Sequence, residues 1–312
     1  MSAAIPILVI TGQTAGGKER LAVAAAQGVG GEIIGADSMK VYRGMDIGTA
    51  KPSAEQRARV PHHLLDVADP AETFSTARWL ELAQAAIADV HRRGRAAIVS
   101  GGTPLYLKAL IEGLFEGPAA DAALRCRLAA EAQERGPAAL HDRLAKVDPQ
   151  AAARIHPNDL RRIVRALEVW ELTGTPISDL QRQWGARRPE YRPLVVAIRR
   201  EAEDLTRRIT DRVGRMMAAG LVDEVRRLVG RPEGLAPGPR QALGYAEVLD
   251  FLDGRLGQSE LVPAIVAHTR QFARRQMMWI RRFDGVVWLD AAPDTDTAAL
   301  ADGVADLWRG HV

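Results

Sequence analysis

The chain has 312 residues, of which 47% are hydrophobic and 26% are charged, a composition typical of an ordinary soluble globular protein of one or two domains. Its single cysteine, Cys126, excludes an internal disulfide framework and favours a reducing, cytoplasmic environment, and neither a signal peptide nor a membrane-spanning run is expected. The net charge of only +3 does not indicate nucleic-acid binding by itself, and no feature demands more than a monomer.

The first predicted strand, Ile5–Thr11, is followed by a glycine-rich turn and by the predicted helix Lys18–Val29. The spacing Gly12-x-x-x-x-Gly17-Lys18 is that of a P-loop, in which backbone N–H groups, a helix N-terminus and a lysine hold phosphate. We therefore expect a site for the phosphates of a nucleotide or another phosphorylated ligand, formed by Gly12, Gln13, Thr14, Ala15, Gly16, Gly17, Lys18 and Glu19. The alternative interpretation is a left-handed turn that only joins a strand to a helix.

A second predicted strand, Glu32–Ala36, ends at Asp37 and Ser38. Polar side chains at the carboxyl ends of strands line the ligand crevice of open α/β sheets, so Asp37 is expected beside the phosphate loop. The next segment, Met39–Pro52, contains two glycines and a proline and has no hydrophobic period. We interpret it as a long ordered loop over the site, because long loops in compact domains are usually functional.

The neighbouring His62 and His63 raise the question of a metal site, but without a second cluster nearby, hydrogen-bonded structural histidines are the favoured interpretation. A helix is predicted over Ser75–Arg93, with Ser75 as its N-cap. The following predicted elements are the strand Ala96–Ser100, the turn Gly101–Pro104 and the helix Leu105–Glu112. This alternation predicts an α/β fold with a P-loop NTPase-like parallel sheet flanked by helices.

The alternation stops near residue 113 and resumes with the predicted strand Pro193–Arg199. Helices are predicted between them, over about 121–135, 137–146, 158–173 and 176–184. We interpret residues 116–189 as an inserted all-helical subdomain, and residues 1–115 and 190–312 as the catalytic core. From Arg154 to Arg200 the chain has ten Arg against five Asp or Glu, which indicates either a solvated helix face or a contact with a phosphate backbone.

Residues 201–281 are predicted to be mostly helical, including helices over Gln241–Leu252 and Leu261–Phe283. The second of these helices contains several arginines and no acid between them, which suits an RNA surface; they are Arg270, Arg274, Arg275, Arg281 and Arg282. A last strand is predicted at Val286–Asp290 and a last helix at 296–309.

Several separated segments resemble the tRNA dimethylallyltransferase (tRNA isopentenyltransferase) family. They are Asp37-Ser38, Val41 to Pro52, Val60-Pro61-His62-His63-Leu64, Gly101-Gly102-Thr103, Ile155-His156-Pro157-Asn158-Asp159 to Arg162-Ile163, Arg165 to Val169, Gly244-Tyr245, Thr269-Arg270-Gln271, Arg275-Gln276 and Trp279. The resemblance runs along nearly the whole chain and is therefore not confined to the P-loop.

The resemblance implies transfer of a dimethylallyl group from dimethylallyl diphosphate to N6 of the adenosine 3′-adjacent to the anticodon in tRNA. It also implies Mg²⁺ as a cofactor and a helical insertion that grips the anticodon stem-loop. Asp37 would be the general base for the exocyclic amine, and Lys18 would stabilise the leaving diphosphate. Arg212 matches a family arginine at the diphosphate, and Thr103 resembles a position that contacts the flipped region of the tRNA.

The resemblance also implies which residues bind tRNA. They are Asp37, Ser38, Met39, Lys40, Thr103, Arg125, Arg161, Arg162, Ile163, Val164, Arg165, Arg274, Arg275, Gln276 and Arg281. The basic members would hold the RNA backbone or its flanking bases.

Three positions depart from the family pattern. Gln13 stands where Pro is usual, Glu19 stands where the P-loop has Thr or Ser, and Lys40 stands where Gln is expected. Glu19 or Thr14 is the expected Mg²⁺ ligand, although Glu19 also suits a helix N-terminus and would repel a diphosphate. An active enzyme with altered metal ligation is the favoured interpretation, so Glu19→Thr is expected to keep or raise activity with Mg²⁺. Lys40 is expected to add a tRNA contact.

Other functions stay open on the sequence alone. A P-loop kinase of a small metabolite would lack the hydroxyl that Mg²⁺–ATP needs, and would have little use for an arginine-rich insertion. A prenyltransferase of free adenine nucleotides would not need that insertion either. A non-catalytic tRNA-binding protein with a decayed P-loop would not need the intact loop at Asp37.

Overall fold

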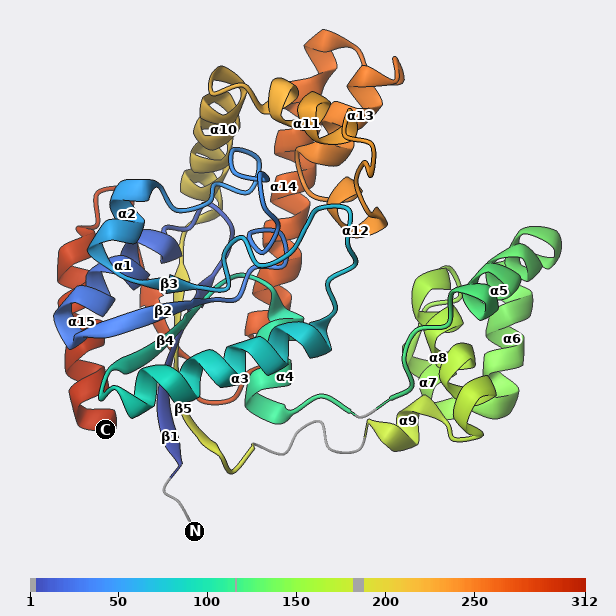
Figure 1. Cartoon of the computed structure of the whole chain (residues 1–312), viewed down its shortest axis with the longest axis horizontal. Coiled ribbons are helices and arrows are strands. Elements are labelled where there is room, and N and C mark those ends of the chain that lie inside the picture. Colours follow the sequence, from blue (N-terminus) through green and yellow to red (C-terminus); the bar gives the residue numbers. More distant parts are fainter. Residues whose placement is uncertain (1–3, 116, 182–187) are drawn as a thin grey trace. The chain divides into compact units, whose positions relative to one another are not determined.

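The computed structural model describes residues 4–115, 117–181 and 188–312. The chain divides into two compact units (Figure 1). The first unit consists of Met1–Ile111 and Pro189–Val312, and the second consists of Glu112–Arg188. The predicted helical insertion, residues 116–189, overlaps the second unit.

In the first unit, the described residues form a six-stranded parallel sheet in the order β3-β2-β4-β1-β5-β6. The strands are β1 (Ile5–Gly12), β2 (Gly31–Gly35), β3 (His62–His63), β4 (Ala96–Ser100), β5 (Tyr191–Arg199) and β6 (Val287–Asp290). In this register Ile10 lies beside Ser100, and Gly12 lies beside Ile198. Because all strands run the same way, the loops that follow β1, β2 and β4 meet at one edge, which confirms the predicted P-loop NTPase-like α/β fold.

The helices of the first unit are α1 (Lys18–Val29), α2 (Ala54–Arg59), α3 (Thr76–Arg92), α4 (Pro104–Glu112), α10 (Ala202–Ala218), α11 (Leu221–Val229), α12 (Pro237–Arg240), α13 (Tyr245–Leu252), α14 (Gln258–Ile280) and α15 (Thr297–His311). The helix predicted over Gln241–Leu252 begins only at Tyr245, after the short α12. The N-cap predicted for α3 is confirmed, since the Ser75 hydroxyl accepts a hydrogen bond from the N–H of Arg78.

The sheet is buried between helices. On one face, α1 and α15 pack against each other, and Val304 and Trp308 of α15 lie in a core that also includes Leu8 of β1. α3 packs on β2 and β4, where its Trp79 donates a hydrogen bond to the Gly35 carbonyl and stacks on Tyr106 of α4 with ring centroids 4.4 Å apart. β1 therefore lies inside the sheet between β4 and β5, with Ile7 to Gly12 buried, and the glycine-rich turn follows its carboxyl end.

His62 and His63 belong to the short edge strand β3, which the sequence did not predict. The His63 ring lies 2.8 Å from a carboxylate oxygen of Glu32, and the His62 ring nitrogen Nδ1 lies 2.7 Å from the Val60 carbonyl. The hydrogen bond from Arg93 is the largest cause that lowers the pKa of Glu32, to about 2. These contacts give both histidines structural partners, and within the described residues no three His, Cys, Asp or Glu side chains gather as a metal site requires.

The second unit is all helical in its described residues. Its helices are α5 (Ala122–Arg135), α6 (Pro137–Val147), α7 (Pro149–Arg154), α8 (Leu160–Thr173) and α9 (Ile177–Leu180). They share a core to which Leu128, Leu144 and Leu167 contribute fully buried side chains. The helix predicted over 176–184 is described only as far as α9, because residues 182–187 lie outside the described residues.

A buried carboxylate ties α5 to α8 in this unit. Glu168 is fully buried and accepts hydrogen bonds from Arg125, from Arg165 and from the backbone N–H of Asp121. Burial raises the pKa of Glu168, but the bonds from Arg125 and Arg165 outweigh it and leave the pKa below its ordinary value. The pair of arginines thus serves the core of the helical unit.

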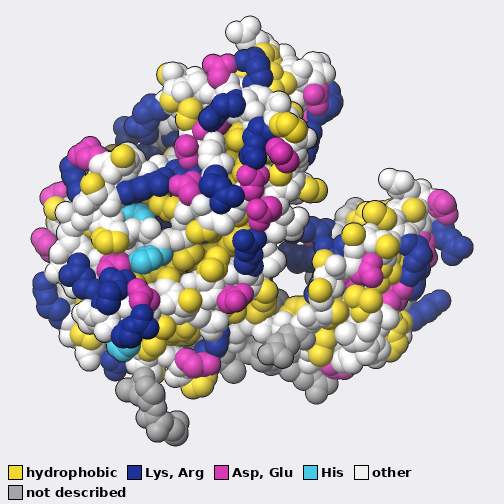
Figure 2. Space-filling model, viewed as in Figure 1, with side chains coloured by type: hydrophobic (Ala, Val, Ile, Leu, Met, Phe, Trp, Pro, Cys, Tyr) yellow, Lys and Arg dark blue, Asp and Glu magenta, His cyan; other side chains and the backbone are white. Residues whose placement is uncertain are grey.

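In the part of the chain that the structure describes, no helix combines the length and the apolar composition that a bilayer crossing requires. On the face drawn in Figure 2, Lys and Arg side chains are interspersed with Asp and Glu. The two signs of charge are mixed on this face, so a basic site has to be identified from particular cavities or helices.

We expect Glu168→Gln to destabilise the helical unit by about 2 kcal/mol, because the amide loses two charge-assisted bonds inside the core. A lowered carboxyl pKa stabilises the fold above the unfolded value near 4.5, and this stabilisation is lost as the pH falls below it. Hydrogen exchange of the α8 amides at pH 7 and pH 4 measures both effects. The control is Glu171→Gln, because the Glu171 side chain also pairs with two arginines, Arg127 and Arg143, but is 21% exposed, whereas that of Glu168 is 0% exposed. Equal protection in both variants at both pH values would contradict the assignment.

Candidate active site

The glycine-rich turn after β1 has the geometry of a phosphate-binding loop. Gly12 has φ +150°, and a Cβ there would lie 2.6 Å from Cγ2 of Ile198, so only glycine fits. Gly17, with φ +103°, begins α1 and leaves the first N–H groups of that helix without a side-chain cap. The Gln13 carbonyl accepts hydrogen bonds from the Gly16 N–H at 3.0 Å and from Lys18 Nζ at 3.4 Å. The loop is thus folded so that a helix N-terminus and Lys18 face one space.

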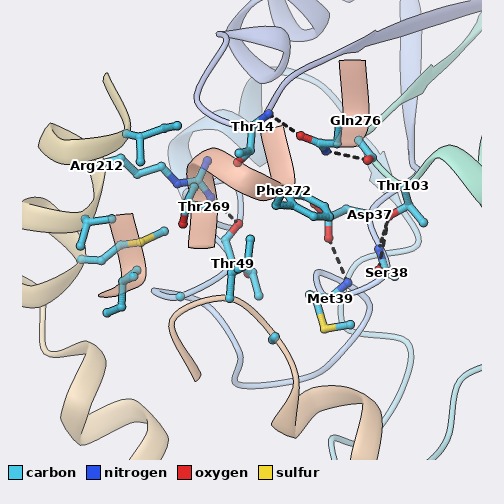
Figure 3. A pocket seen from close by; sticks show the side chains of 18 of the residues that line it. Thr14, Asp37, Ser38, Met39, Thr49, Thr103, Arg212, Thr269, Phe272 and Gln276 are labelled. Carbon is cyan, nitrogen blue, oxygen red and sulfur yellow. Dashed lines mark hydrogen bonds between the residues drawn. The ribbon is translucent and has the colours of Figure 1, made fainter. Parts of the chain in front are cut away.

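Asp37 and Ser38 lie where the chain leaves β2, opposite Thr103 in the turn after β4 (Figure 3). One carboxylate oxygen of Asp37, Oδ1, accepts the N–H groups of Met39 at 2.9 Å and Lys40 at 3.3 Å. The Thr103 hydroxyl accepts the Ser38 N–H at 3.0 Å. Oδ2 of Asp37 has no hydrogen bond to any described residue and is available to a ligand.

The phosphate loop and Asp37 line the same cavity, whose volume is about 230 Å³. Lys18 and Thr14 contribute from the phosphate loop, and Arg212 contributes from α10 (Figure 3). The Arg212 guanidinium donates to the Thr49 carbonyl at 3.3 Å. The four residues predicted to be catalytic, Lys18, Asp37, Thr103 and Arg212, are therefore brought together around one space.

Two cations in this cavity are held at a cost that an anion would relieve. Burial, followed by the nearby charge of Lys40, lowers the pKa of Lys18 to about 8. Burial also lowers the pKa of Arg212, although the charges of Asp37 and Glu19 oppose that change. A polyanionic ligand beside Lys18 and Arg212 would favour their charged forms, as expected for a diphosphate site.

An apolar wall completes the cavity, and the sequence analysis missed it. Ile209, Val213 and Met216 follow one another at i, i+4 and i+7 along α10, and α14 contributes Ile265 and Phe272 on the opposite side. This spacing is the helical period that usually marks a core face. Here the stripe faces an open cavity, which suits a small branched hydrocarbon next to a charged group.

Gln276 of α14 joins two of the loops at the sheet edge. Its Oε1 accepts the N–H of Thr14 at 2.7 Å, and its Nε2 donates to the Gly102 carbonyl at 2.6 Å. The side chain is only 2% exposed. The expectation that Gln276 contacts tRNA is corrected to this extent: its polar ends hold the phosphate loop and the turn after β4 in place.

The loop from Met39 to Pro52 is held by Glu224 of α11, which sequence reasoning also missed. The buried carboxylate accepts the N–H groups of Asp46, Ile47 and Gly48 at 2.8 to 3.0 Å, and the Tyr245 hydroxyl at 2.6 Å. The only sequence signal was an acid in the first turn of a predicted helical region. Glu224 thereby fixes the backbone that carries Thr49 to the cavity.

Glu19, one of the two residues expected as metal ligands, is engaged in an ion pair. Its Oε2 lies 2.5 Å from Nζ of Lys40, and Glu19 is not among the residues that line the cavity. Lys40 is only 8% exposed and its ammonium pairs with Glu19, and the expected tRNA contact by this side chain stays a prediction. Of the two expected Mg²⁺ ligands, only Thr14 faces the cavity.

The predicted RNA-binding arginines of α14 fall on two faces of the helix. Arg275 lines the first cavity with Gln276, whereas Arg274 and Arg281 line a second cavity of about 350 Å³ together with Arg270. Arg199 and Arg200, at the end of β5, contribute to the second cavity, and Glu201 is the acid in its lining. This groove therefore offers a concentration of positive charge beside the phosphate loop.

The predicted RNA-binding residues of the helical unit differ in what they can contact. Arg161 is exposed and has no partner among the described residues, and Arg162 is exposed and paired only with Asp159. Arg125 and Arg165 spend much of their hydrogen-bonding capacity on Glu168, as described above. The exposed pair at the start of α8 is thus the better candidate for an RNA contact.

Ile163 and Val164 were expected to belong to the tRNA surface, and this is corrected for their side chains. Ile163 is fully buried and Val164 is 9% exposed, and both lie in the core of the helical unit. Helical periodicity explains the difference, because residues directly after Arg161 and Arg162 turn toward the inner face of α8.

Comparison with known proteins agrees with this geometry. Residues 40–283 match the family model of IPP transferase. A relative from Anaeromyxobacter sp. (strain Fw109-5), named tRNA dimethylallyltransferase, is 50% identical over 293 residues, which cover 94% of this chain and 97% of the relative. A tRNA dimethylallyltransferase from Alkalilimnicola ehrlichii is 51% identical over 286 residues, which cover 91% of this chain and 90% of the relative.

Solved structures give the same result. The chain is similar to the crystal structure of a tRNA isopentenylpyrophosphate transferase from Bacillus halodurans, with a TM-score of 0.71, 38% identity and 98% of each chain covered. It is also similar to a eukaryotic dimethylallyltransferase acting on tRNA, with a TM-score of 0.83 and 28% identity; 99% of this chain and 81% of that chain are covered.

We expect Glu224→Gln to destabilise the first unit by about 3 kcal/mol, because the amide group would face backbone donors with a donor of its own. Urea denaturation followed by tryptophan fluorescence measures the change. Tyr245→Phe is the matched control, since it removes a single hydrogen bond to the same carboxylate and is expected to cost about 1 kcal/mol. A Glu224→Gln variant as stable as Tyr245→Phe would show that the loop does not depend on this carboxylate.

Proposed function

The chain belongs to the IPP transferase family of tRNA dimethylallyltransferases, and we propose that it transfers the dimethylallyl group of dimethylallyl diphosphate to N6 of the adenosine 3′-adjacent to the anticodon. The observation that carries the proposal is the shared cavity. A lysine and an arginine for a diphosphate, an apolar wall for a short hydrocarbon and a carboxylate oxygen for an amine proton line one space.

The chemistry follows from these groups. The adenine N6 attacks C1 of the dimethylallyl group, a C–N bond forms, and the C–O bond to the diphosphate breaks with its electrons leaving on oxygen. Lys18, Arg212 and the backbone N–H groups of the phosphate loop stabilise that leaving charge. The exocyclic amine is a poor nucleophile because its lone pair is delocalised, so it must lose a proton as the bond forms. Oδ2 of Asp37 accepts this proton.

The acceptor base has to leave its stack to reach Asp37, because the carboxylate lies at the sheet edge beside the phosphate loop. Thr103, which is hydrogen-bonded to Ser38, stands beside the path of the extruded base. Thr103 is therefore proposed to contact the base or its sugar. Asp37 itself is oriented by the N–H groups of Met39 and Lys40.

Mg²⁺ remains part of the proposal. When bound with the diphosphate it would add positive charge at the leaving group, and Thr14, one of the two residues expected as ligands, lines this cavity. Since Mg²⁺ commonly keeps water and takes substrate phosphate oxygens as ligands, a single hydroxyl from the protein is compatible with such a site.

The tRNA partner is supported by the family relatives, and we propose the anticodon stem-loop as the part that is bound. Exposed arginines at the start of α8 and the arginine-lined groove beside α14 are the candidate contacts with its phosphates. A monomer in the cytoplasm is the simplest arrangement for such an enzyme. The relatives favour this function over a metabolite kinase and over a non-catalytic RNA-binding protein.

The direct test is incubation with unmodified tRNA and dimethylallyl diphosphate, followed by nucleoside analysis. We expect N6-dimethylallyladenosine to accumulate at the position next to the anticodon. Parallel reactions with labelled ATP and with free adenosine monophosphate test the kinase and the nucleotide-prenylating alternatives. Phosphoryl transfer from ATP, or prenylation of free adenosine monophosphate, with the tRNA left unmodified would overturn the proposal.

We expect Asp37→Asn to lower kcat by about 10²–10⁴-fold while tRNA affinity stays nearly unchanged, because the amide keeps the shape of the side chain but cannot take a proton. Single-turnover kinetics and filter binding measure the two quantities. Asp46→Asn is the control in the same loop, since its carboxylate is exposed and paired with Lys51. Normal turnover in Asp37→Asn would remove this carboxylate from the mechanism.

The pKa of Lys18, lowered to about 8 by burial, predicts a limit on the alkaline side. The ammonium is charged below this value and neutral above it, so kcat/KM for dimethylallyl diphosphate should fall as the pH rises past about 8. Lys18→Arg keeps its charge at high pH and should shift this fall upward. An identical alkaline limb in Lys18→Arg would assign the titration to another group.

Replacing both Arg270 and Arg274 by alanine should weaken tRNA binding. It should also make the negative slope of log affinity against log salt concentration shallower by about 2. Turnover at saturating tRNA should change little, because neither side chain lines the cavity that contains Asp37. Arg309→Ala, an exposed arginine of α15 paired with Asp306, is the control. An unchanged salt slope in the double variant would mean that the groove does not contact RNA.

A further inference from the structure

We propose that Glu19 and Lys40 pair with each other, so that Lys40 does not form an ion pair with Asp37 and Glu19 does not form one with Lys18. The two residues act as one positioning unit for the reaction proposed above, on which this inference rests. They are also two of the three positions that depart from the family pattern, and they lie against each other in the fold. This role differs from those expected from the sequence, which are a metal ligand for Glu19 and an RNA contact for Lys40.

The geometry links the pair to both halves of the site. Glu19 directly follows Lys18 in the first turn of α1, so its side chain is attached to the backbone next to the lysine proposed to bind diphosphate. Lys40 donates its backbone N–H to Oδ1 of Asp37 at 3.3 Å, so the backbone that carries the lysine side chain lies against the proposed general base. The Glu19–Lys40 contact of 2.5 Å joins the phosphate-loop helix to the Asp37 turn.

Burial favours the pairing. The Lys40 side chain is 10% exposed and buried, whereas that of Glu19 is 28% exposed and only partly buried. A buried charge that loses its partner keeps its desolvation cost and seeks the nearest opposite charge. Asp37 is adjacent to Lys40, whose backbone N–H it accepts, and Lys18 directly precedes Glu19 in α1; each of these is a group that the reaction needs free.

The consequences of breaking the pair therefore differ on its two sides. Without the Glu19 carboxylate, Lys40 is free to pair with Asp37, which would lower the basicity of Asp37 and slow the proton-transfer step. Without the Lys40 ammonium, Glu19 is free to pair with Lys18, which would weaken the hold on diphosphate. Removing both charges removes both unwanted pairings. This differs from the expectation from sequence that Glu19→Thr alone keeps activity.

The experiment is a double-mutant cycle on the full chain with Glu19→Gln, Lys40→Gln and the double variant. Glu19→Gln should lower kcat about tenfold with a smaller change in KM for dimethylallyl diphosphate. Lys40→Gln should instead raise that KM about tenfold, and the double variant should return both constants to within about threefold of the original. Lys40→Arg, which keeps the charge, should retain both constants within about threefold.

A matched cycle at an exposed ion pair provides the control. Glu55→Gln, Arg59→Gln and their combination remove the same kind of contact from the surface helix α2, and should leave both constants unchanged. Thermal unfolding of every variant identifies those that do not fold. If a single variant is unfolded, the comparison of the double variant with Lys40→Arg still decides, because the proposal requires both to be active.

Three results would overturn the proposal: normal kcat in Glu19→Gln, normal KM in Lys40→Gln, or a double variant that combines the losses of the singles. Binding of inorganic diphosphate, measured by calorimetry, is the readout that does not depend on tRNA. It should weaken in Lys40→Gln and recover in the double variant even if the chain modifies another acceptor. Failure of tRNA prenylation by the unchanged chain would instead overturn the proposed function.

Discussion

Parallel pairing of β1 with β4, and of β4 with β2, is the constraint on which the site depends. It sends three chain segments out of the same edge of the sheet, so that Lys18, Asp37 and Thr103 meet although they are far apart in sequence. The buried core around β1 leaves this edge as the place where polar groups of these strands can reach a ligand. Lys18 of the phosphate loop and the carboxylate of Asp37 thereby line one cavity.

Helices α10 and α14 supply further walls of the pocket at this edge. α10 supplies Arg212 next to an apolar stripe, and α14 supplies Gln276, whose two polar ends hold the phosphate loop and the turn after β4. Glu19 and Lys40 form an ion pair with each other, and neither of them lines the pocket. The pocket can therefore present free cations to a leaving diphosphate and a free carboxylate oxygen to an amine.

Local signals in the sequence predicted much of this arrangement. Gly12, Gly17 and Lys18 are recognisable because the turn needs glycine and the spacing is fixed, and Asp37 follows from its place at a strand end. The partners that lie far away in sequence were not predicted. The contacts of Glu224 and Gln276 with their loops are recognised only in the folded structure. Similarly, nothing in the sequence near Glu168 indicates that its carboxylate would accept hydrogen bonds from two predicted RNA-binding arginines, Arg125 and Arg165. The strand β3 was missed because its two residues are too few to show the alternating hydrophobic pattern of a strand.

The central claim is that one cavity holds the diphosphate and the extruded adenine together. A crystal structure of the chain with a non-reactive thio analogue of dimethylallyl diphosphate and an anticodon stem-loop tests it most directly. The account predicts diphosphate oxygens within hydrogen-bonding distance of Lys18 and Arg212, and the adenine N6 within hydrogen-bonding distance of Oδ2 of Asp37. Diphosphate and adenine in separate cavities, or an N6 that faces a group other than Asp37, would contradict it.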